Sequence, residues 1–392
     1  MRPVSVRTIV GIVLMGHYLS AFTVLGLPLF LPLFLSSLIT AVPAWMYGVF
    51  YIIPTLLTAV FTPWWGRMAD RYGYRLSLQR AYGGLAIGFF LAGVSQSIGL
   101  FLLALFIQGI CGGAMGASNA YLGSFLDRAQ LRVALNWTQF SARLAMVTAP
   151  WVIGLVMDYK PGLYIYSLLS LFPLSAFFLS FLLPITDKKP ESNASITGKN
   201  GLMPLDAESM PPIKLPLLLG LQAVYSFSMV VTFPYFVLYA HKLGLKSNGV
   251  IGFFYGFPHL VYLMGMPALK KYRPPNALFN GLFLFAVSVL FQGYSPTIGS
   301  LVLFRLLMGV GIILTYCGLH DVLSHWAKAA NSGAIFGQFD SAGKFSGAFA
   351  GLAAGFLVQN GNVFSPFYVA AVASFAAAFF ILPYMKAVEG SA

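Results

Sequence analysis

The sequence is poor in charge. Only 8% of its 392 residues are Asp, Glu, Lys or Arg, whereas soluble domains carry roughly 25%. Hydrophobic residues make up 58% of the chain, and the mean hydropathy is +0.81. This composition excludes a water-soluble enzyme and is enough for roughly 11 or 12 membrane-spanning helices of about 20 residues each. We therefore expect the lipid bilayer to surround the protein.

Cysteine is scarce as well. Cys111 and Cys317 both lie in apolar stretches, which excludes a disulfide framework and a thiolate metal cluster. His320 and His325 would lie roughly 140° apart around a helix, so they do not form a metal site. The glycine-rich stretch from Gly109 lacks the Lys-Ser/Thr ending of a phosphate-binding loop. No metal or other cofactor is expected, and ATP is excluded as the direct energy source.

Acidic residues are few, and the net charge is +13. In a soluble protein this would suggest a nucleic-acid partner, but here the basic residues gather in loops on one side of the predicted spans. The opposite side has only Lys160, Lys242 and Lys246. By the positive-inside rule, the sequence predicts a multi-pass protein of the inner (plasma) membrane with both termini in the cytoplasm, and no nucleic-acid partner.

Apolar runs form two groups of six, separated by a polar stretch rich in Pro, Ser, Asn and charge. The sequence therefore predicts an all-α membrane protein with an N-terminal six-helix bundle over 1–184, a cytoplasmic linker over 185–213 and a C-terminal six-helix bundle over 214–392. Short matches about 200 residues apart, such as QFSAR from Gln139 and QFDSAGK from Gln338, indicate a duplicated six-helix unit.

The loop between spans two and three reads GRMADRYGYR. It resembles the G-x-x-x-D-R-x-G-x-R loop of the major facilitator superfamily, in the place where that family has it. The resemblance implies twelve helices in two pseudo-symmetric bundles that transport a substrate by alternating access. It also implies a cytoplasmic gate formed by Gly66, Asp70, Arg71, Gly73, Arg75 and, at the end of span four, Asp127.

Within this gate, we expect Gly66 to let the second helix end against its neighbour and Gly73 to allow a tight turn. An ordinary basic loop is the alternative interpretation, and Asp127 could equally be an interfacial charge beside Arg128.

The resemblance to the proton-linked exporters of the same family is partial. Their Arg-x-x-x-Gly-x-Gly element in span four has Leu105 at the arginine position here, although span ten carries Arg305 followed by Gly309 and Gly311. Their Gly-Pro element in span five is Ala149-Pro150 in this chain. The resemblance favours export, and uptake stays open.

Four charged residues lie inside predicted spans: Arg143, Arg305, Asp340 and Lys344. Such residues are costly at bilayer depth and usually face a cavity or a partner. Asp340 and Lys344 are four residues apart on one helix and can pair, in which case they could simply neutralise each other. Together the four sum to +2, which predicts an electropositive central cavity for an anionic or carboxylate-bearing substrate.

Polar stripes on the same helices complete the predicted site. The candidate substrate-binding residues are Arg143, Gln139, Asn136, Arg305, Lys344, Gln108, Asn119, Tyr225, Tyr255 and His259. Asp340 is the acidic residue at depth and the first candidate for proton coupling, followed by His17. A structural hydrogen bond between helices is the alternative role for His17.

These patterns predict a secondary active transporter that works as a monomer and uses the proton gradient, with no cofactor. The favoured function is efflux of a small anionic or zwitterionic organic molecule, such as a drug, a metabolite or a carboxylate siderophore. The alternative is a proton symporter that imports an organic anion or a sugar. An enzyme is not expected, because no nucleophile and base, and no set of metal ligands, converge at one depth.

Overall fold

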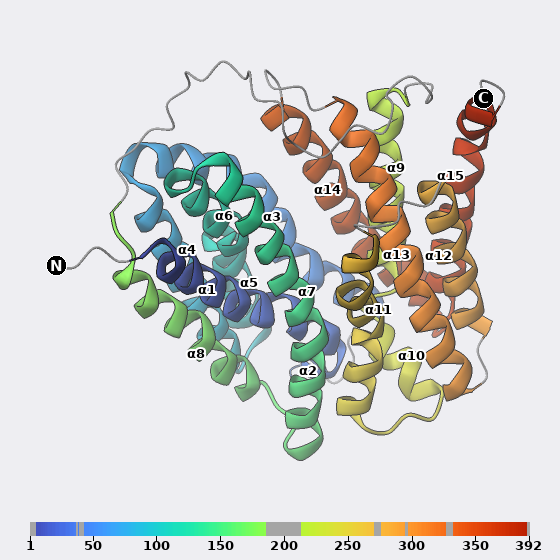
Figure 1. The fold of residues 1–392 in the computed structure, drawn as a ribbon. Helices are drawn as coiled ribbons and strands as arrows, with labels where there is room; N and C mark the ends of the chain where they lie inside the picture. The colour runs from blue at the N-terminus through green and yellow to red at the C-terminus, as the bar shows by residue number, and fades with distance from the viewer. Residues whose placement is uncertain are drawn as a thin grey trace.

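The computed structural model describes residues 5–36, 38, 43–185, 213–269, 276–294, 297–326 and 332–389. Within these ranges every regular element is a helix (Figure 1). The predicted linker lies almost wholly outside them, as do the basic residues expected between spans eight and nine.

The described part of the first half contains ten helical segments. They are α1 (Val6–Gly26), η1 (Leu27–Phe30), α2 (Leu31–Leu35), α3 (Ala44–Tyr72), α4 (Tyr74–Gly93), α5 (Ile98–Cys111), α6 (Ala114–Phe125), α7 (Arg128–Tyr159), α8 (Tyr164–Leu179) and η2 (Ser180–Leu182). The described part of the second half contains seven. They are α9 (Leu215–Val231), α10 (Phe236–Lys242), α11 (Asn248–Leu269), α12 (Ala277–Tyr294), α13 (Ile298–Trp326), α14 (Ser332–Val358) and α15 (Ser365–Glu389).

Three of the predicted spans are broken helices. In the first, a proline lies in the first turn of both η1 and α2, where proline is tolerated, whereas it is disfavoured in the interior of a helix. In the fourth, α5 ends at Cys111, Gly112 follows it, and Gly113 takes a φ of 85°, a conformation that favours glycine. In the seventh, α9 and α10 meet at an angle of 47°. In the sequence, the segments of each broken span form one apolar run, because the breaks between them are short.

Nine helices in the described part are long and apolar enough to cross a membrane, and the bent pair α9 and α10 makes ten. Helices α4 and α11 have 20 and 22 residues, which at 1.5 Å per residue is enough for a hydrocarbon core about 30 Å thick. Helix α4 carries Arg75, Gln79 and Arg80, and α11 carries Asn248 and His259, yet both helices pack against neighbouring helices. With these two helices, the spans come to the twelve that the sequence predicts.

The helices pack into two bundles. In the first, α4 lies against α5 and α8, and α1 against α7 and α8; in the second, α12 lies against α13 and α15, and α14 against α9. The bundles meet along two seams, α7 with α11 and α3 with α14. Figure 1 shows them diverging toward the top of the view and converging below, where α7 approaches α11. Small residues line the seams, since Gly252 faces the Pro150 carbonyl and Gly48 faces the backbone of Gly351.

We call the side of the molecule on which α1 begins and α15 ends the terminal side, and the other the opposite side. On the opposite side, the last turn of α7 holds the first turn of α11. Asp158 accepts hydrogen bonds from Ser247 Oγ (2.5 Å), from Asn248 N (2.7 Å) and Nδ2 (3.0 Å), and from Gly249 N (3.0 Å). A carboxylate at a helix N-terminus is favourable, so Asp158 fastens the two bundles together on the opposite side.

Candidate functional site

A cavity of about 600 Å³ lies between the two bundles, which we call the polar cavity. Five helices line it, α3 and α7 from the first bundle and α9, α13 and α14 from the second. Its polar lining side chains are Tyr51, Thr55, Gln139, Arg143, Gln222, Tyr225, Ser226, Tyr316, His320, Asp340 and Lys344. The volume is within the usual range for small-molecule sites.

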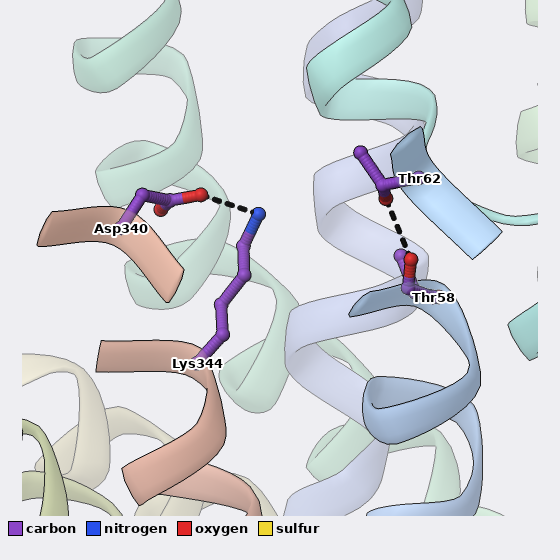
Figure 2. A network of polar contacts seen from close by, with 4 residues as sticks. All are labelled: Thr58, Thr62, Asp340 and Lys344. Carbon is purple, nitrogen blue, oxygen red and sulfur yellow. Dashed lines mark hydrogen bonds and ion pairs between the residues drawn. The ribbon is translucent and has the colours of Figure 1, made fainter. Parts of the chain in front are cut away.

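Asp340 and Lys344 form an ion pair inside this cavity. The carboxylate and the ammonium are 2.6 Å apart on successive turns of α14, and their side chains are 63% and 46% exposed. Figure 2 shows the pair projecting toward α3, where Thr62 Oγ1 donates a 2.6 Å hydrogen bond to the Thr58 carbonyl. The pair is open to a ligand because it is so exposed.

Arg143 links the two bundles at the same cavity. Its guanidinium is 3.1 Å from Nδ1 of His259 on α11 and lies 4.5 Å from the ring centroid of Tyr262. Arginine only donates hydrogen bonds, so Nδ1 of His259 accepts and its proton is on Nε2. Arg143, Asp340 and Lys344 give the described lining of the polar cavity one net positive charge.

A second, smaller chamber of about 280 Å³ adjoins the polar cavity, and we call it the apolar chamber. The two share Tyr51, Thr55, Met229 and Val230. Its other lining residues are mostly aliphatic or aromatic: Val24, Leu25, Leu27, Pro28, Leu31, Phe50, Pro54, Phe89, Leu105, Gln108, Met146, Tyr166, Phe233 and Tyr255.

The structure brings several of the predicted substrate-binding residues together. Gln139, Arg143, Tyr225 and Lys344 line the polar cavity together with Asp340. Two others, Gln108 and Tyr255, line the apolar chamber. His259 reaches the site through Arg143, and Asn136 is exposed on α7, one turn before Gln139.

Arg305 lies apart from both spaces. It is 2% exposed, its Nε donates to the Phe254 carbonyl at 3.2 Å, and its terminal nitrogen donates to the Tyr255 carbonyl. The guanidinium also lies 4.5 Å from the ring centroid of Phe236. The expectation of a cavity carrying +2 is therefore corrected to +1, because backbone carbonyls and aromatic rings surround the Arg305 charge within the second bundle.

Two further predicted residues lie outside both spaces. His17 is buried, and its Nδ1 is 2.7 Å from the Ser141 hydroxyl, which makes the interhelical hydrogen bond that was the alternative role for this residue. Asn119 is on α6, and its Oδ1 is buried without a hydrogen-bond partner in the described part of the chain.

The predicted gate residues make their contacts within the first bundle. Asp70 accepts a 2.6 Å hydrogen bond from Tyr74, Arg75 donates to the Phe181 carbonyl at 3.0 Å, and Arg71 lies over the ring of Tyr72. Asp127 caps α7 by accepting a 2.9 Å hydrogen bond from the Gln130 backbone. These local contacts agree with the divergence of the bundles toward the top of Figure 1.

The two glycines of this loop differ. Gly73 separates α3 from α4 with a φ of 99°, as expected for the tight turn. Gly66 was expected to let the helix end against a neighbour, and this is wrong: α3 continues to Tyr72, and a side chain at Gly66 would meet no atom within 4 Å.

Sequence reasoning missed four polar lining residues, Tyr51 and Thr55 on α3, and Tyr316 and His320 on α13. Each pair is four residues apart and therefore shares a helix face. That spacing of polar groups within an apolar helix was the available signal. The other two polar lining residues, Gln222 and Ser226, belong to the polar stripe that includes Tyr225 on α9.

Known proteins resemble this chain in sequence and in fold. The profile of the Major Facilitator Superfamily matches residues 12–273. Multidrug resistance protein MdtG of Salmonella arizonae is 27% identical over 295 residues, which are 71% of each chain. The D-xylose-proton symporter superposes with a TM-score of 0.77 at 15% identity, over 97% of this chain and 99% of that one.

The human organic anion transporter TETRAN superposes with a TM-score of 0.68 at 18% identity, over 96% of this chain and 99% of that one. At these identities the two solved structures establish the fold alone. The family profile covers more than half of the chain and agrees with its two helical bundles. The chain therefore belongs to the Major Facilitator Superfamily, a family of membrane transporters for small molecules and not of enzymes.

Proposed function

We propose that this protein is a proton-driven exporter of a small organic anion or zwitterion. The observation that carries the proposal is the net positive charge of the polar cavity, where Arg143 and the exposed Asp340–Lys344 pair line one space between the bundles. A carboxylate would supply the missing negative charge and satisfy arginine donors in a low-dielectric site. A drug, a metabolite or a carboxylate siderophore would fit.

Two observations support export rather than uptake. The sequence relative MdtG is named as a multidrug resistance protein. The chain also carries part of the exporter elements, in Ala149-Pro150 and in the Arg305 motif. The basic loops favour a cytoplasmic terminal side, so that the cavity opens toward the cytoplasm and is closed by Asp158 on the outer side, a state that exporters and importers both pass through.

Asp340 is the proposed proton carrier. Its carboxylate can take up a proton, and its partner Lys344 holds it ionised while the pair is intact. A substrate carboxylate that binds Lys344 competes for this ion pair. Once the substrate has left on the outer side, a proton takes its place in breaking the pair by binding Asp340, and the proton is given up in the cytoplasm when Lys344 pairs with Asp340 again.

In this cycle, the segments 1–184 and 214–392 rock against each other in the inner membrane, joined by the cytoplasmic linker 185–213. The polar cavity is formed within one chain, so a monomer suffices.

The proposal is tested by comparing small molecules in cells and in spent medium. The strains lack the protein, carry it unchanged, or carry Lys344→Ala or Lys242→Ala. Lys242 lies over the ring of Phe364, outside the polar cavity, and serves as the matched control. We expect an anionic or zwitterionic compound to stay inside cells without the protein and to leave with the unchanged chain or the control. A medium component that stays unused without the protein would instead establish uptake, the alternative function.

A further inference from the structure

The apolar chamber adjoins the polar cavity at a wall of four shared residues and has no role in charge recognition. We propose that it holds the hydrocarbon or aromatic tail of the substrate, while the anionic group binds at Arg143. The substrate class is then an amphipathic organic carboxylate, with an apolar tail at one end and the charged group at the other. This inference rests on the proposed function and makes its substrate more specific.

The order of residues along α7 and α9 supports this division. Along α7, Gln139 and Arg143 line the polar cavity and Met146 lines the apolar chamber. Along α9, Tyr225 lines the polar cavity and Met229 reaches both spaces. Both helices run away from the terminal side, so the apolar chamber is the deeper space. One helical turn, about 5.4 Å, separates the charged level from the apolar one, so a single small molecule can reach both.

Aromatic rings form part of the wall of the chamber. The ring of Phe233 contacts those of Tyr51 (centroids 5.4 Å apart) and Tyr255 (5.1 Å). Gln108, the amide in the lining, donates to the Gly88 carbonyl at 3.2 Å and is thereby already engaged. The chamber therefore offers apolar area more than hydrogen bonds, which favours a hydrocarbon tail over a sugar, whose hydroxyls would lose hydration without sufficient partners.

The test measures binding of straight-chain carboxylates, from butanoate to decanoate, to the full-length protein in phosphatidylcholine nanodiscs. Isothermal titration is corrected with protein-free nanodiscs, which removes partition into lipid. We expect the dissociation constant to fall about fourfold per added methylene until the chamber is full, and then to level off. Arg143→Gln weakens all chain lengths by a similar factor, because it acts on the charged end.

Two variants act on the chamber itself. Val24→Phe, which places a ring in the chamber, moves the levelling point to shorter chains, and Met146→Ala, which widens it, moves the point to longer chains. Val152→Phe is the matched control, because Val152 is on the exposed face of α7. A levelling point at the same chain length in Val24→Phe, Met146→Ala and the control would overturn the inference.

Failure of the inference and failure of the proposed function give different results. Carboxylates that bind through Arg143 with no dependence on chain length overturn the tail site alone. If no carboxylate binds at any length, both the anion specificity and the tail site are overturned.

Discussion

Single residues in this protein divide into those that face the polar cavity and those that the bundles enclose. Arg143 and Lys344 bring charge to the cavity, whereas Arg305 is buried among carbonyls and rings, and His17 is bonded to Ser141. The helical stripe of Gln139 and Arg143 could be predicted, because the helical repeat and the position of each residue along its span follow from the sequence. The neighbours of Arg305 could not, because they come from other helices.

Asp340→Asn should abolish the acceleration of transport by a proton gradient, since an amide does not ionise. The substrate should still bind. Loss of the carboxylate leaves Lys344 without its partner, so we expect anions to bind roughly three- to tenfold tighter. Uptake into everted vesicles with and without a pH gradient checks the first effect, and titration checks the second. Asp340→Glu is the control and should keep gradient-driven transport; full gradient-driven transport by Asp340→Asn would assign the proton to another group.

At the scale of helices, turns and caps determine how the bundles are connected. The α3–α4 turn depends on the conformation of Gly73, whereas Gly66 is inside α3 and touches nothing. The two glycines belong to one motif, but only the backbone conformation at Gly73 favours glycine. The turn could be predicted from the motif; the continuation of α3 past Gly66 could not, because it depends on how far the bundles diverge.

Gly73→Ala should destabilise the protein by about 1 to 3 kcal/mol, because a side chain strains a residue with a φ of 99°. Gly66→Ala should be neutral or stabilise by up to about 1 kcal/mol, since alanine favours the helix and meets no neighbour. Thermal unfolding of the two purified variants compares these effects directly. Equal losses in both variants would contradict this account of the loop.

Asp158→Asn should loosen the closure on the opposite side, because an amide cannot accept all four hydrogen bonds that the carboxylate receives there. We expect a cysteine at Thr55, in the cavity wall, to react about three- to tenfold faster with an impermeant maleimide applied from that side. The background carries Ser in place of Cys111 and Cys317. Asp127→Asn is the control, since Asp127 caps its own helix; unchanged labelling of Asp158→Asn would exclude the fastening role.

At the scale of the whole molecule, the layout of spans could be predicted because a bilayer forces each crossing to be helical and apolar. Helices α4 and α11, which carry polar residues within their apolar runs, were found by their place in the series. The closed seam between α7 and α11 could not be predicted, because it depends on which face of each bundle meets the other. The division of the lining into polar and apolar parts depends in the same way on packing between helices.

The whole transport cycle should respond to voltage. Currents recorded from proteoliposomes on a solid-supported membrane should accompany transport of a monoanion, and Asp340→Asn should reduce the charge moved per substrate. A neutral zwitterion should carry one charge fewer per cycle than a monoanion. Equal currents for both substrates would contradict the proposed exchange.

In the proposed cycle, the Asp340–Lys344 pair and Arg143 imply that the membrane potential acts on one half of the cycle. With a monoanion bound and Asp340 ionised, the loaded cavity is electrically neutral on its way out. With the substrate gone and Asp340 protonated, the returning cavity carries two positive charges and is drawn toward a negative interior. At about 2.3 kcal/mol per charge per 100 mV, a potential of about 100 mV supplies about 4.6 kcal/mol to each return. The voltage thus resets the empty carrier, and the loaded one crosses without electrical work.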